Sequence, residues 1–420
     1  MRTVPRRHYE WAARPIVHQG VAHTSEYGRA APNVDVAIVS YFNPTDFGGG
    51  AERIAWAEAE LLAADRAVAF VCASPPAEAG AFRQYRLGGW TRALYQPLGR
   101  RRNLALLAAF HLLSLFNPVA FVEALTLFRK LRPRVVHTHN LVALSPAVWL
   151  AARMSGARVV HTHQDLWLLC ERATMTDARG RLCNESQTVC RLCRALRPVK
   201  TAAMSPVQLE IFPSRWLGDR LGRGGEVVPN FAIAPPADVA SAAWSGDVPT
   251  IAYLGSLVPH KLGALLDAFG LIRRRGIEIH LAVAGSGPLA AEVRDLARSE
   301  PAIDFLGEVD VDGRNRLLAR ASAVVIPSTC PETSPLVFFE ALAAGLPVIA
   351  SDIGGMTELV RYENVVLVPP GDGGALADAI VTVLGDRAQR VELRAGAERH
   401  AAEASAARYA KQLLPLLGRS

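Results

Sequence analysis

Residues 324–360 read VVIPSTCPETSPLVFFEALAAGLPVIASDIGGMTELV, and this stretch decides the fold more than any other part of the chain. Its two short apolar runs, Ala323–Ile326 and Val348–Ser351, are typical of buried parallel strands. Between them, Pro335 fits the first turn of a helix and Gly345 fits its end. The stretch therefore predicts a β–α–β unit with a glycine turn after its second strand.

Two carboxylates frame the predicted start of this helix. Glu332 lies in the loop before the helix and Glu340 lies on its second turn. Open parallel sheets bind ligands beyond the carboxyl ends of their strands, where the amides at the start of the next helix attract phosphate. Those amides belong to Leu336 and Val337, and carboxylates suit sugar hydroxyls. The pattern predicts a sugar-nucleotide site, with two acids on a solvated helix start as the structural alternative.

The two glutamates, the apolar helix ending in AGLPVIAS and the GG-x-x-E turn together resemble the retaining glycosyltransferases of family 4. The resemblance covers residues 34–383 of the chain. It implies an α/β protein of the GT-B fold, in which two Rossmann-like domains with doubly wound parallel sheets face a central cleft. It also implies that Glu332 faces the donor sugar as a catalytic residue and that Glu340 holds the ribose.

A second motif supplies the diphosphate clamp that the resemblance implies. The turn GSLVPHK begins at Gly255 and ends at Lys261, which matches the family's catalytic, donor-binding lysine. Ser256 stands where the family usually has arginine, so one positive charge is missing from this turn. We expect the charge to be absent or supplied by another residue, either Arg320 or an arginine of the N-terminal domain. A solvated helix start is the structural alternative for Lys261.

Two further glycine turns follow predicted strands. Gly285 and Gly287 belong to GSGPLA, which lies beside the nucleotide in the family. Gly49 and Gly50 follow the predicted strand Val34–Ser40, and in the family this turn closes over the donor. Glycine permits close approach of the backbone to a ligand, although a run of glycines alone is more often a plain loop.

Histidines end two other predicted strands, in HTHNL from His137 and HTHQD from His161. The resemblance implies that a histidine of the second motif contacts the donor sugar in the cleft, and we assign this catalytic role to His163. The family form T-x-H-D-x-W-x-L-C, aligned by its D, W and C matches, instead places Gln164 at the histidine position. Either the loop differs by one residue or glutamine replaces histidine. The histidines could also be no more than polar residues at strand ends.

Four of the six cysteines cluster as C-x12-C-x6-C-x2-C, at Cys170, Cys183, Cys190 and Cys193. Four thiolates match a structural zinc site in ligand type, although the spacing is not a common zinc template. Free thiols are the alternative, because cytoplasmic proteins rarely keep disulfides. A closed shell of four thiolates would leave no position for chemistry, so any zinc here would be structural. We expect no cofactor to be required for catalysis, because Lys261 and the amides of Leu336 and Val337 would stabilise the leaving group.

Charge and hydropathy limit the partners of the chain. The formal net charge of its 420 residues is +7, and residues 1–33 and 170–223 account for it with local excesses of +3 and +5. The near-neutral remainder argues against a nucleic-acid groove and for local attraction to phosphates or anionic lipid. Met1–Pro32 lacks the apolar core of a secretory signal. We therefore expect a cytoplasmic protein that can associate with the inner face of the membrane.

One strongly apolar stretch, Leu104–Phe128, follows the triplet Arg100–Arg102. The Asn117–Pro118 break cuts this stretch into two shorter helices, and neither of them is long enough to span a bilayer. We favour a buried helix pair over insertion into a membrane surface.

These patterns divide the chain into five parts. The parts are a flexible basic tail (1–33), an N-terminal acceptor-binding domain (34–232) with a cysteine-rich loop (170–193), a linker (233–249), a C-terminal nucleotide-sugar-binding domain (250–394) and a helical segment that can cross back to the N-terminal domain (395–420).

The function that the resemblance implies is retaining hexosyl transfer from a UDP- or GDP-sugar to a saccharide or lipid-linked acceptor, in surface polysaccharide biosynthesis. A catalytically silent GT-B subunit that binds a nucleotide sugar or a partner is an alternative, favoured by Ser256 and Gln164. A metal-dependent transferase using the D-x-D of Asp310 and Asp312 is a third reading. That motif lies late in the chain, where a solvated loop is the simpler interpretation.

Overall fold

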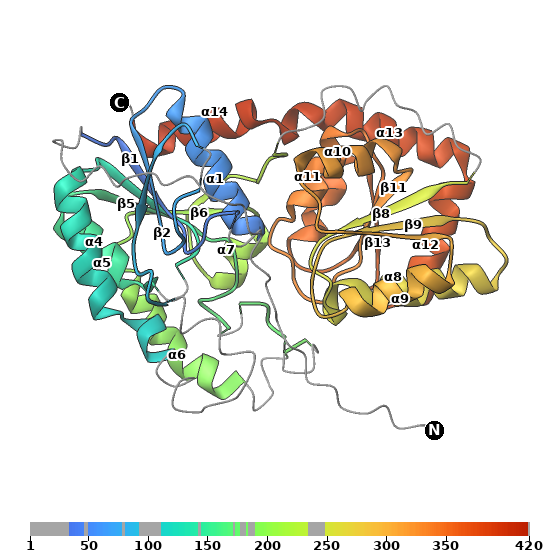
Figure 1. Ribbon diagram of the computed structural model, residues 1–420, viewed down its shortest axis with the longest axis horizontal. Coiled ribbons are helices and arrows are strands. Elements are labelled where there is room, and N and C mark those ends of the chain that lie inside the picture. Colours follow the sequence, from blue (N-terminus) through green and yellow to red (C-terminus); the bar gives the residue numbers. More distant parts are fainter. Residues whose placement is uncertain are drawn as a thin grey trace. The chain divides into compact units, whose positions relative to one another are not determined.

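The computed structural model describes residues 33–45, 49–77, 80–91, 111–141, 144–170, 173–176, 182–183, 190–233 and 248–418, apart from the side chains of residues 190 and 192. The chain divides into two compact units (Figure 1). Within these described ranges, the first unit draws on Met1–Thr162, Val199–Glu210 and Leu417–Ser420, and the second on His163–Pro198 and Ile211–Leu416. The predicted linker lies almost entirely outside the described residues.

The first sheet has seven strands in the order β3-β2-β1-β4-β5-β6-β7. Their bounds are β1 Val36–Val39, β2 Val68–Cys72, β3 Arg83–Arg86, β4 Val135–Thr138, β5 Arg158–Thr162, β6 Leu209–Phe212 and β7 Glu226–Val227. Strand β1 pairs in parallel with both β2 and β4, and Val39 lies opposite Thr138. The apolar residues of β1, β2 and β4 are buried on both faces, as expected for a parallel sheet.

Helices connect these strands, as the sequence predicts for an α/β fold. They are α1 Gly50–Ala63, α4 Pro118–Leu131, α5 Ala147–Met154, α6 Cys190–Ala203 and α7 Arg215–Leu221. Helix α4 begins at the predicted break, because the Asn117 side chain accepts a hydrogen bond from the Ala120 amide and Pro118 occupies the first turn.

Residues 104–110 of the predicted buried helix pair lie outside the described residues, and the part from His111 on is buried on one face only. Residues spaced about one turn apart, such as Ala120, Ala124 and Phe128, are buried, and α4 packs against α5. The other face exposes apolar side chains, including 67% of Leu112 and 60% of Val122. By length and composition alone, His111–Leu131 could cross a membrane. Within its most apolar window of 18 residues, 28% is buried. A partly buried amphipathic helix passes the same test.

The second sheet has six strands in the order β10-β9-β8-β11-β12-β13. Their bounds are β8 Thr250–Leu254, β9 His280–Ala284, β10 Ile303–Gly307, β11 Ala323–Ile326, β12 Val348–Ser351 and β13 Val365–Val368. Alternate residues of the strands supply two hydrophobic clusters: Ile251 and Val325 belong to one, and Ala252 and Val324 to the other. The sheet is therefore covered by helices on both faces, as the doubly wound prediction requires.

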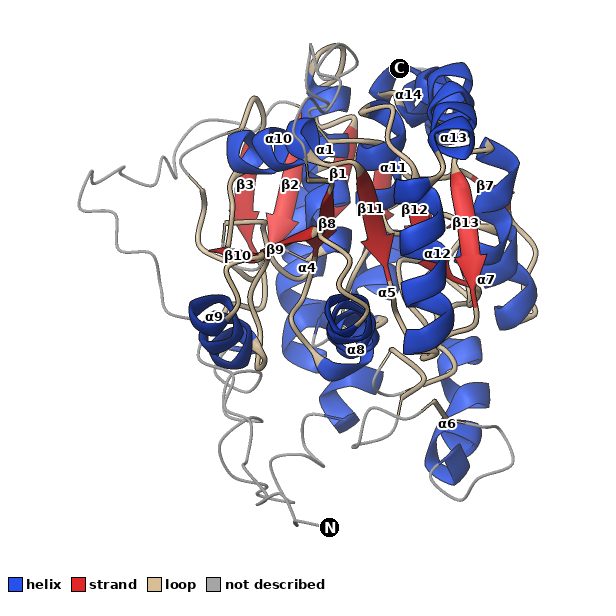
Figure 2. Ribbon diagram, turned by 90° about the vertical axis from the view of Figure 1, so that its right-hand side faces the viewer, coloured by secondary structure: helices blue, strands red, loops and turns tan. Residues whose placement is uncertain are grey.

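Helical elements alternate with the strands as far as β13, and the last four helical elements follow β13 in succession. They are α8 Pro259–Arg274, α9 Ala290–Ser299, α10 Val311–Arg320, α11 Leu336–Ala343, the 3-10 helix η4 Gly355–Tyr362, α12 Gly373–Gly385, α13 Arg387–His400, the 3-10 helix η5 Ala401–Ala404 and α14 Ala406–Leu417. Helices α8 and α12 pack against each other (Figure 2). The predicted β–α–β unit is confirmed as β11, α11 and β12, with the two strands parallel neighbours.

Both sheets have the strand order of a Rossmann fold, 3-2-1-4-5-6 when each is numbered from its own first strand, with a seventh strand on the first sheet. In this order, the chain reverses its direction of winding between the first and fourth strands. Ligands of open parallel sheets bind at this switch point, beyond the carboxyl ends of the strands. The switch points lie between β1 and β4 in the first sheet and between β8 and β11 in the second.

Candidate functional site

Two charged side chains that the sequence singled out meet at the switch point of the second sheet. Lys261 lies in the first turn of α8, which follows β8, and Glu332 lies in the loop after β11. The Lys261 Nζ is 3.0 Å from the Glu332 Oε1. The Ser328 hydroxyl donates a hydrogen bond of 2.7 Å to the same oxygen. Sequence reasoning missed Ser328, although its position four residues before Glu332 in the same short loop was a usable signal.

The pair is charged and reachable from solvent. Burial alone would raise the pKa of Glu332, but the Lys261 ammonium and the Ser328 hydrogen bond together hold it below its ordinary value. The Glu332 carboxylate in turn raises the pKa of Lys261. The side chains remain 31% exposed for Lys261 and 16% exposed for Glu332. The arrangement therefore presents a fixed ammonium and a fixed carboxylate at the edge where a ligand is expected.

Glycines let the turns after β8 and β9 pack directly on each other. The Leu257 amide donates to the Ser286 carbonyl at 2.7 Å, and the Gly255 amide donates to the Ala284 carbonyl at 3.0 Å. Gly285 has φ +143°, and a Cβ placed on it would lie 1.8 Å from the Gly255 carbonyl oxygen. A Cβ on Gly287 would lie 2.6 Å from the Leu257 carbonyl oxygen. These predicted donor-site glycines are thus required for the shape of the turn that precedes Lys261.

A second glycine pair supports the loop that carries Glu332. The Gly355 amide donates to the Glu332 carbonyl at 2.7 Å, and Glu332 forms an isolated parallel bridge with Gly354. A Cβ on Gly354 would come within 2.6 Å of the Glu332 carbonyl oxygen. The GG-x-x-E turn of the sequence therefore places the Glu332 backbone, which in turn places its carboxylate.

Glu340 differs from Glu332 in its surroundings. Its side chain is buried on α11, and the Arg314 guanidinium donates a hydrogen bond of 2.5 Å to its Oε1. Burial raises the pKa of Glu340 to about 7, although Arg314 opposes the shift. Sequence reasoning missed Arg314, which lies in the first turns of α10, beyond the carboxyl end of β10.

Three further predictions concern residues of α10 and α11. Arg320 lies at the carboxyl end of α10, toward the opposite edge of the sheet, so the expectation that it supplies the missing charge is wrong. Asp310 and Asp312 lie at the start of α10 rather than in the predicted solvated loop, and Asp310 caps the helix by accepting a hydrogen bond of 2.7 Å from the Gly313 amide. Leu336 and Val337 form the first turn of α11, whose amides have no acceptor within the helix itself.

His163 follows β5 and is buried in the second unit. Its ring stacks on Phe212 with 4.8 Å between centroids and 4° between planes, and its amide donates to the Ile211 carbonyl at 2.9 Å. Its ring therefore packs on an aromatic side chain. The Thr333 hydroxyl donates a hydrogen bond of 3.0 Å to the Gln164 carbonyl, so within this unit Gln164 lies beside the loop of Glu332.

The first sheet carries polar side chains at its own switch point. Gly49 is the N-cap residue of α1 and Gly50 is its first residue. Glu52, in the first turn, is buried and accepts a hydrogen bond of 3.0 Å from the Asn140 amide group. The predicted glycine turn thus leads directly into a helix N-terminus.

A buried cluster of one carboxylate and two histidines lies farther along α1, where this helix packs on the first sheet. Glu58 of α1 contacts His137 of β4, with 2.5 Å from Oε1 to Nδ1, and His139 after β4, with 3.4 Å from Oε2 to Nε2. Burial would raise the pKa of Glu58, but the two histidines hold it far below its ordinary value. Burial lowers the pKa of His139, against the opposing effect of Glu58. On the other face of the sheet, the Thr138 hydroxyl lies 2.9 Å from His161 Nδ1. His137, His139 and His161 are therefore core residues with polar partners.

The cysteine cluster is described only in part. Cys170 is buried and Cys183 and Cys193 are half-buried. The side chain of Cys190 lies outside the described residues. The zinc site stays a prediction.

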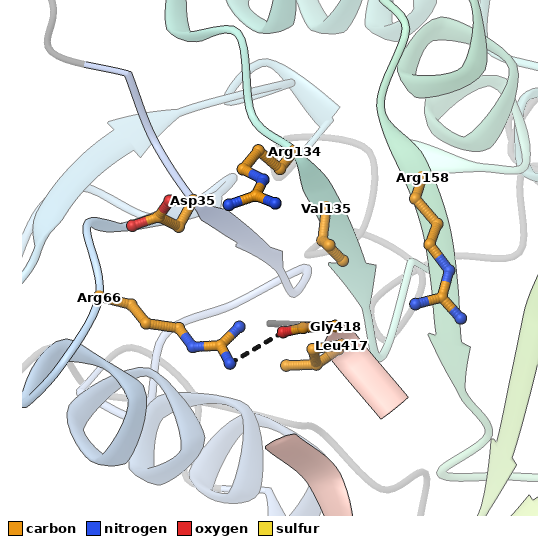
Figure 3. A pocket seen from close by; sticks show the side chains of 7 residues that line it. All are labelled: Asp35, Arg66, Arg134, Val135, Arg158, Leu417 and Gly418. Atoms are coloured by element: carbon orange, nitrogen blue, oxygen red, sulfur yellow. Dashed lines mark hydrogen bonds between the residues drawn. The ribbon is translucent and has the colours of Figure 1, made fainter. Parts of the chain in front are cut away.

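A hollow of about 220 Å³ lies at the amino edge of the first sheet (Figure 3). Its lining residues are Asp35, Arg66, Arg134, Val135, Arg158, Leu417 and Gly418. Arg66 donates a hydrogen bond of 3.0 Å to the Gly418 carbonyl, which fastens the end of the described chain to this edge. Because ligands of parallel sheets bind at the carboxyl edge, this hollow is not the candidate site.

One part of the chain matches a family model. Residues 248–386 match the family described as Glycosyl transferases group 1. This range contains Lys261, Glu332 and Glu340, together with the glycine turns that position the first two.

Relatives with named functions match over parts of their length. The phosphatidyl-myo-inositol mannosyltransferase of Mycobacterium leprae is 29% identical over 63% of this chain and 68% of its own length. The protein of that name from Mycobacterium tuberculosis is 31% identical over 45% of this chain, and the match spans about half (52%) of that relative. The GDP-mannose-dependent alpha-(1-6)-phosphatidylinositol monomannoside mannosyltransferase of Mycobacterium tuberculosis is 35% identical over 36% of this chain and 42% of its own length.

Solved structures match over nearly the whole chain. Sucrose-phosphate synthase from Thermosynechococcus elongatus superposes with a TM-score of 0.69 and 23% identity, covering 91% of this chain and 98% of that one. HepE from Anabaena, solved with UDP and glucose, superposes with a TM-score of 0.64 and 17% identity, covering 92% and 100%. The chain therefore has the GT-B fold and carries a glycosyl transferases group 1 domain over residues 248–386.

Proposed function

We propose that the chain is a retaining glycosyltransferase that transfers a hexose from a nucleotide-diphosphate sugar. The observation that carries the proposal is the Lys261–Glu332 pair, held 3.0 Å apart at the switch point of the second sheet. An ammonium suits the diphosphate and a carboxylate suits the sugar hydroxyls, so one pair offers both kinds of contact that this donor needs. The family match over residues 248–386 supports the same reading.

The chemistry assigned to these residues is an exchange of partners. Without ligand, Lys261 neutralises Glu332. When a diphosphate binds Lys261, the Glu332 carboxylate becomes available to the donor sugar. The amides of Leu336 and Val337, at the start of α11, add hydrogen-bond donors for the phosphate oxygens and favour the negative charge of the leaving group. The departing nucleoside diphosphate would thus be stabilised by the chain's own groups, and we propose that no divalent ion is required.

Glu340 would hold the ribose, as the resemblance suggests, with its buried carboxylate oriented by Arg314. Burial of this acid between α10 and α11 fixes its position before the ligand arrives. Arg314 would then be a positioning residue, because it acts on the ligand through Glu340.

The donor and acceptor are proposed by class. The relatives include a protein named for its use of GDP-mannose, and a structural neighbour was solved with UDP and glucose, so both nucleotides need testing. A saccharide or lipid-linked acceptor, as in surface polysaccharide synthesis, is consistent with relatives named for phosphatidylinositol substrates. The exposed Leu112 and Phe116 before α4 and Val122 on α4, with Arg129 and Lys130 in its last turn, support contact with the inner face of an anionic membrane.

A catalytically silent subunit is the second candidate. Ser256 is exposed in the clamp and its carbonyl accepts a hydrogen bond of 2.8 Å from Tyr253, so this turn offers no second cation. Such a subunit would bind the nucleotide sugar without turning it over. The proposed zinc in the cysteine-rich loop would be structural in either case.

The test is a panel of UDP- and GDP-hexoses offered to the full chain with membrane lipid extract, with and without EDTA. We expect one donor to be consumed, with EDTA having no effect, and proton NMR of the product to show the anomeric configuration of the donor retained. Glu332→Gln should abolish most turnover, whereas Asp312→Asn, at an exposed acid of α10, should not. Donor binding without turnover would favour the silent subunit. Inhibition by EDTA together with loss in Asp312→Asn would favour the metal-dependent reading.

A further inference from the structure

One cluster of chemically competent side chains has no part in the proposed transfer. Glu58, His137 and His139 lie in the first unit, and all three side chains are 0% exposed. One nitrogen or oxygen atom from each lies within 4.8 Å of the others. Among the residues that the structure describes, these three form a group with the atoms and spacing needed to hold a metal ion.

The donor set suits a transition metal. Two imidazole nitrogens and one carboxylate are the protein ligands of many zinc and non-haem iron sites. Ligands placed about 2.0–2.2 Å from zinc in a tetrahedron lie roughly 3.3–3.6 Å from one another. The His139 Nε2 to Glu58 Oε2 distance of 3.4 Å matches this spacing. The His137 Nδ1 lies 2.5 Å from Glu58 Oε1, which is shorter than the usual N–H···O hydrogen bond of about 2.7–3.2 Å. A small outward shift of one ring would reach the spacing of metal ligands.

The outer nitrogen of one histidine is already oriented. His137 Nε2 lies 2.7 Å from the Thr162 hydroxyl at the end of β5. Metal-ligating histidines usually donate this second ring N–H to a neighbouring polar group, which fixes the tautomer and the direction of the ring. The His137 and His139 rings have their centroids 4.5 Å apart and are inclined by 41°, so both nitrogens can face one carboxylate.

A fourth polar atom shares this face of the sheet. Val39 lies opposite Thr138, so the next residues, Ser40 and His139, present their side chains to the same face. The Ser40 side chain is 0% exposed, and its Oγ has no hydrogen-bond partner among the described residues. A buried hydroxyl of this kind is costly unless something binds it.

We propose that Glu58, His137 and His139 bind a divalent transition metal ion, with zinc as the first candidate, and that this ion fastens helix α1 to strand β4. The ion would be structural, because the complete burial of its ligands leaves no access for a substrate. Ser40 Oγ is the candidate for a further ligand. Loading would occur during folding, since the folded chain encloses all three side chains.

The experiment separates this site from the predicted cysteine site. The full chain is expressed as Cys190→Ser with Cys193→Ser, in minimal medium supplied with either zinc or cobalt. We expect about one metal ion per chain by elemental analysis, and a visible cobalt spectrum without the near-ultraviolet thiolate bands that cysteine ligands would add. The same background with Glu58→Gln or with His139→Asn should lose both signals.

His161→Asn is the matched control, because His161 lies on the neighbouring strand with its ring on the opposite face of the sheet. It should keep the full metal content. Far-ultraviolet circular dichroism verifies that each variant folds. Absence of metal and of any cobalt spectrum in the folded background protein would overturn the proposal. The three side chains would then be held together by hydrogen bonds and ion pairs alone. Metal retained in folded Glu58→Gln and His139→Asn proteins would overturn it as well.

Discussion

The two sheets have the same strand order but different polar clusters at their switch points. At the first, Glu58 and its two histidines are fully buried, with every side chain 0% exposed. At the second, Lys261 and Glu332 are held by glycine turns and remain 31% and 16% exposed. A sugar nucleotide can reach only the second cluster, whereas a single ion can be enclosed in the first. The two clusters therefore differ in exposure as well as in residue type.

The largest expected effect comes from removing the buried acid. Glu58→Ala leaves two buried imidazoles without their carboxylate, and breaking a buried charged pair costs about 3–5 kcal/mol. Glu332→Ala removes a partly exposed acid and its hydrogen bond from Ser328, so a smaller loss of about 1.5–3 kcal/mol is expected. Urea unfolding at pH 7.5, followed by circular dichroism, measures both free energies of unfolding. Equal losses of unfolding free energy for the two variants would contradict the difference in burial that we describe between the two clusters.

A smaller effect tests whether the second site depends on its glycines. Gly285→Ala would force a Cβ against the Gly255 carbonyl at a positive φ, and we expect a loss of about 2–4 kcal/mol. Gly263→Ala is the matched control, because Gly263 is in α8 and a Cβ there meets no atom within 4 Å. The control should gain up to about 1 kcal/mol. Similar unfolding midpoints for the two variants would show that the turns are not held together as described.

The third effect separates the two acids of the second site by pH. Burial raises the pKa of Glu340 to about 7, so the folded chain binds a proton there more tightly than the unfolded chain does. This contribution to stability falls as the pH rises through the window from about 4.5 to about 7. Between pH 5 and pH 8, the wild type should therefore lose about 1–3 kcal/mol relative to Glu340→Gln.

Glu332 provides the control for this measurement. Its pKa is lowered, so its titration falls below the ordinary range of a glutamate and its stability contribution is lost only at acid pH. The Glu332→Gln and wild-type stability curves should stay parallel between pH 5 and pH 8. If Glu340→Gln also parallels the wild type, then Arg314 keeps Glu340 ionised in the fold and our assignment of its pKa is wrong.

How far the sequence could predict this molecule depended on whether a feature was local. Strands β11 and β12, the helix between them and its stop at Gly345 were predictable, because apolar runs and glycine act within a few residues. Lys261 and Glu332 could be proposed from motifs. Their 3.0 Å contact needed the fold, since 70 residues separate the loops that carry them.

Residues that act through distant partners were missed. Arg314 carries no motif, and only the packing of α10 near α11 brings it to Glu340. Glu58 reads as an ordinary helix position until the register of β4 places His137 and His139 under it. The apolar stretch before Phe128 misled in the opposite direction, because hydropathy does not report which face of a helix has a neighbour.

The most direct test of the central claim is donor turnover by Lys261→Met. This substitution keeps much of the side-chain length but removes the ammonium that we assign to the diphosphate. Product formed from the preferred UDP- or GDP-hexose is compared among the wild type, Lys261→Met and Lys411→Met, an exposed lysine of α14. We expect kcat/KM to fall about 100-fold in Lys261→Met, equivalent to about 2.7 kcal/mol, with the melting temperature little changed and Lys411→Met unaffected. Unchanged kcat/KM in a folded Lys261→Met protein would contradict the assignment of the second switch point as the donor site.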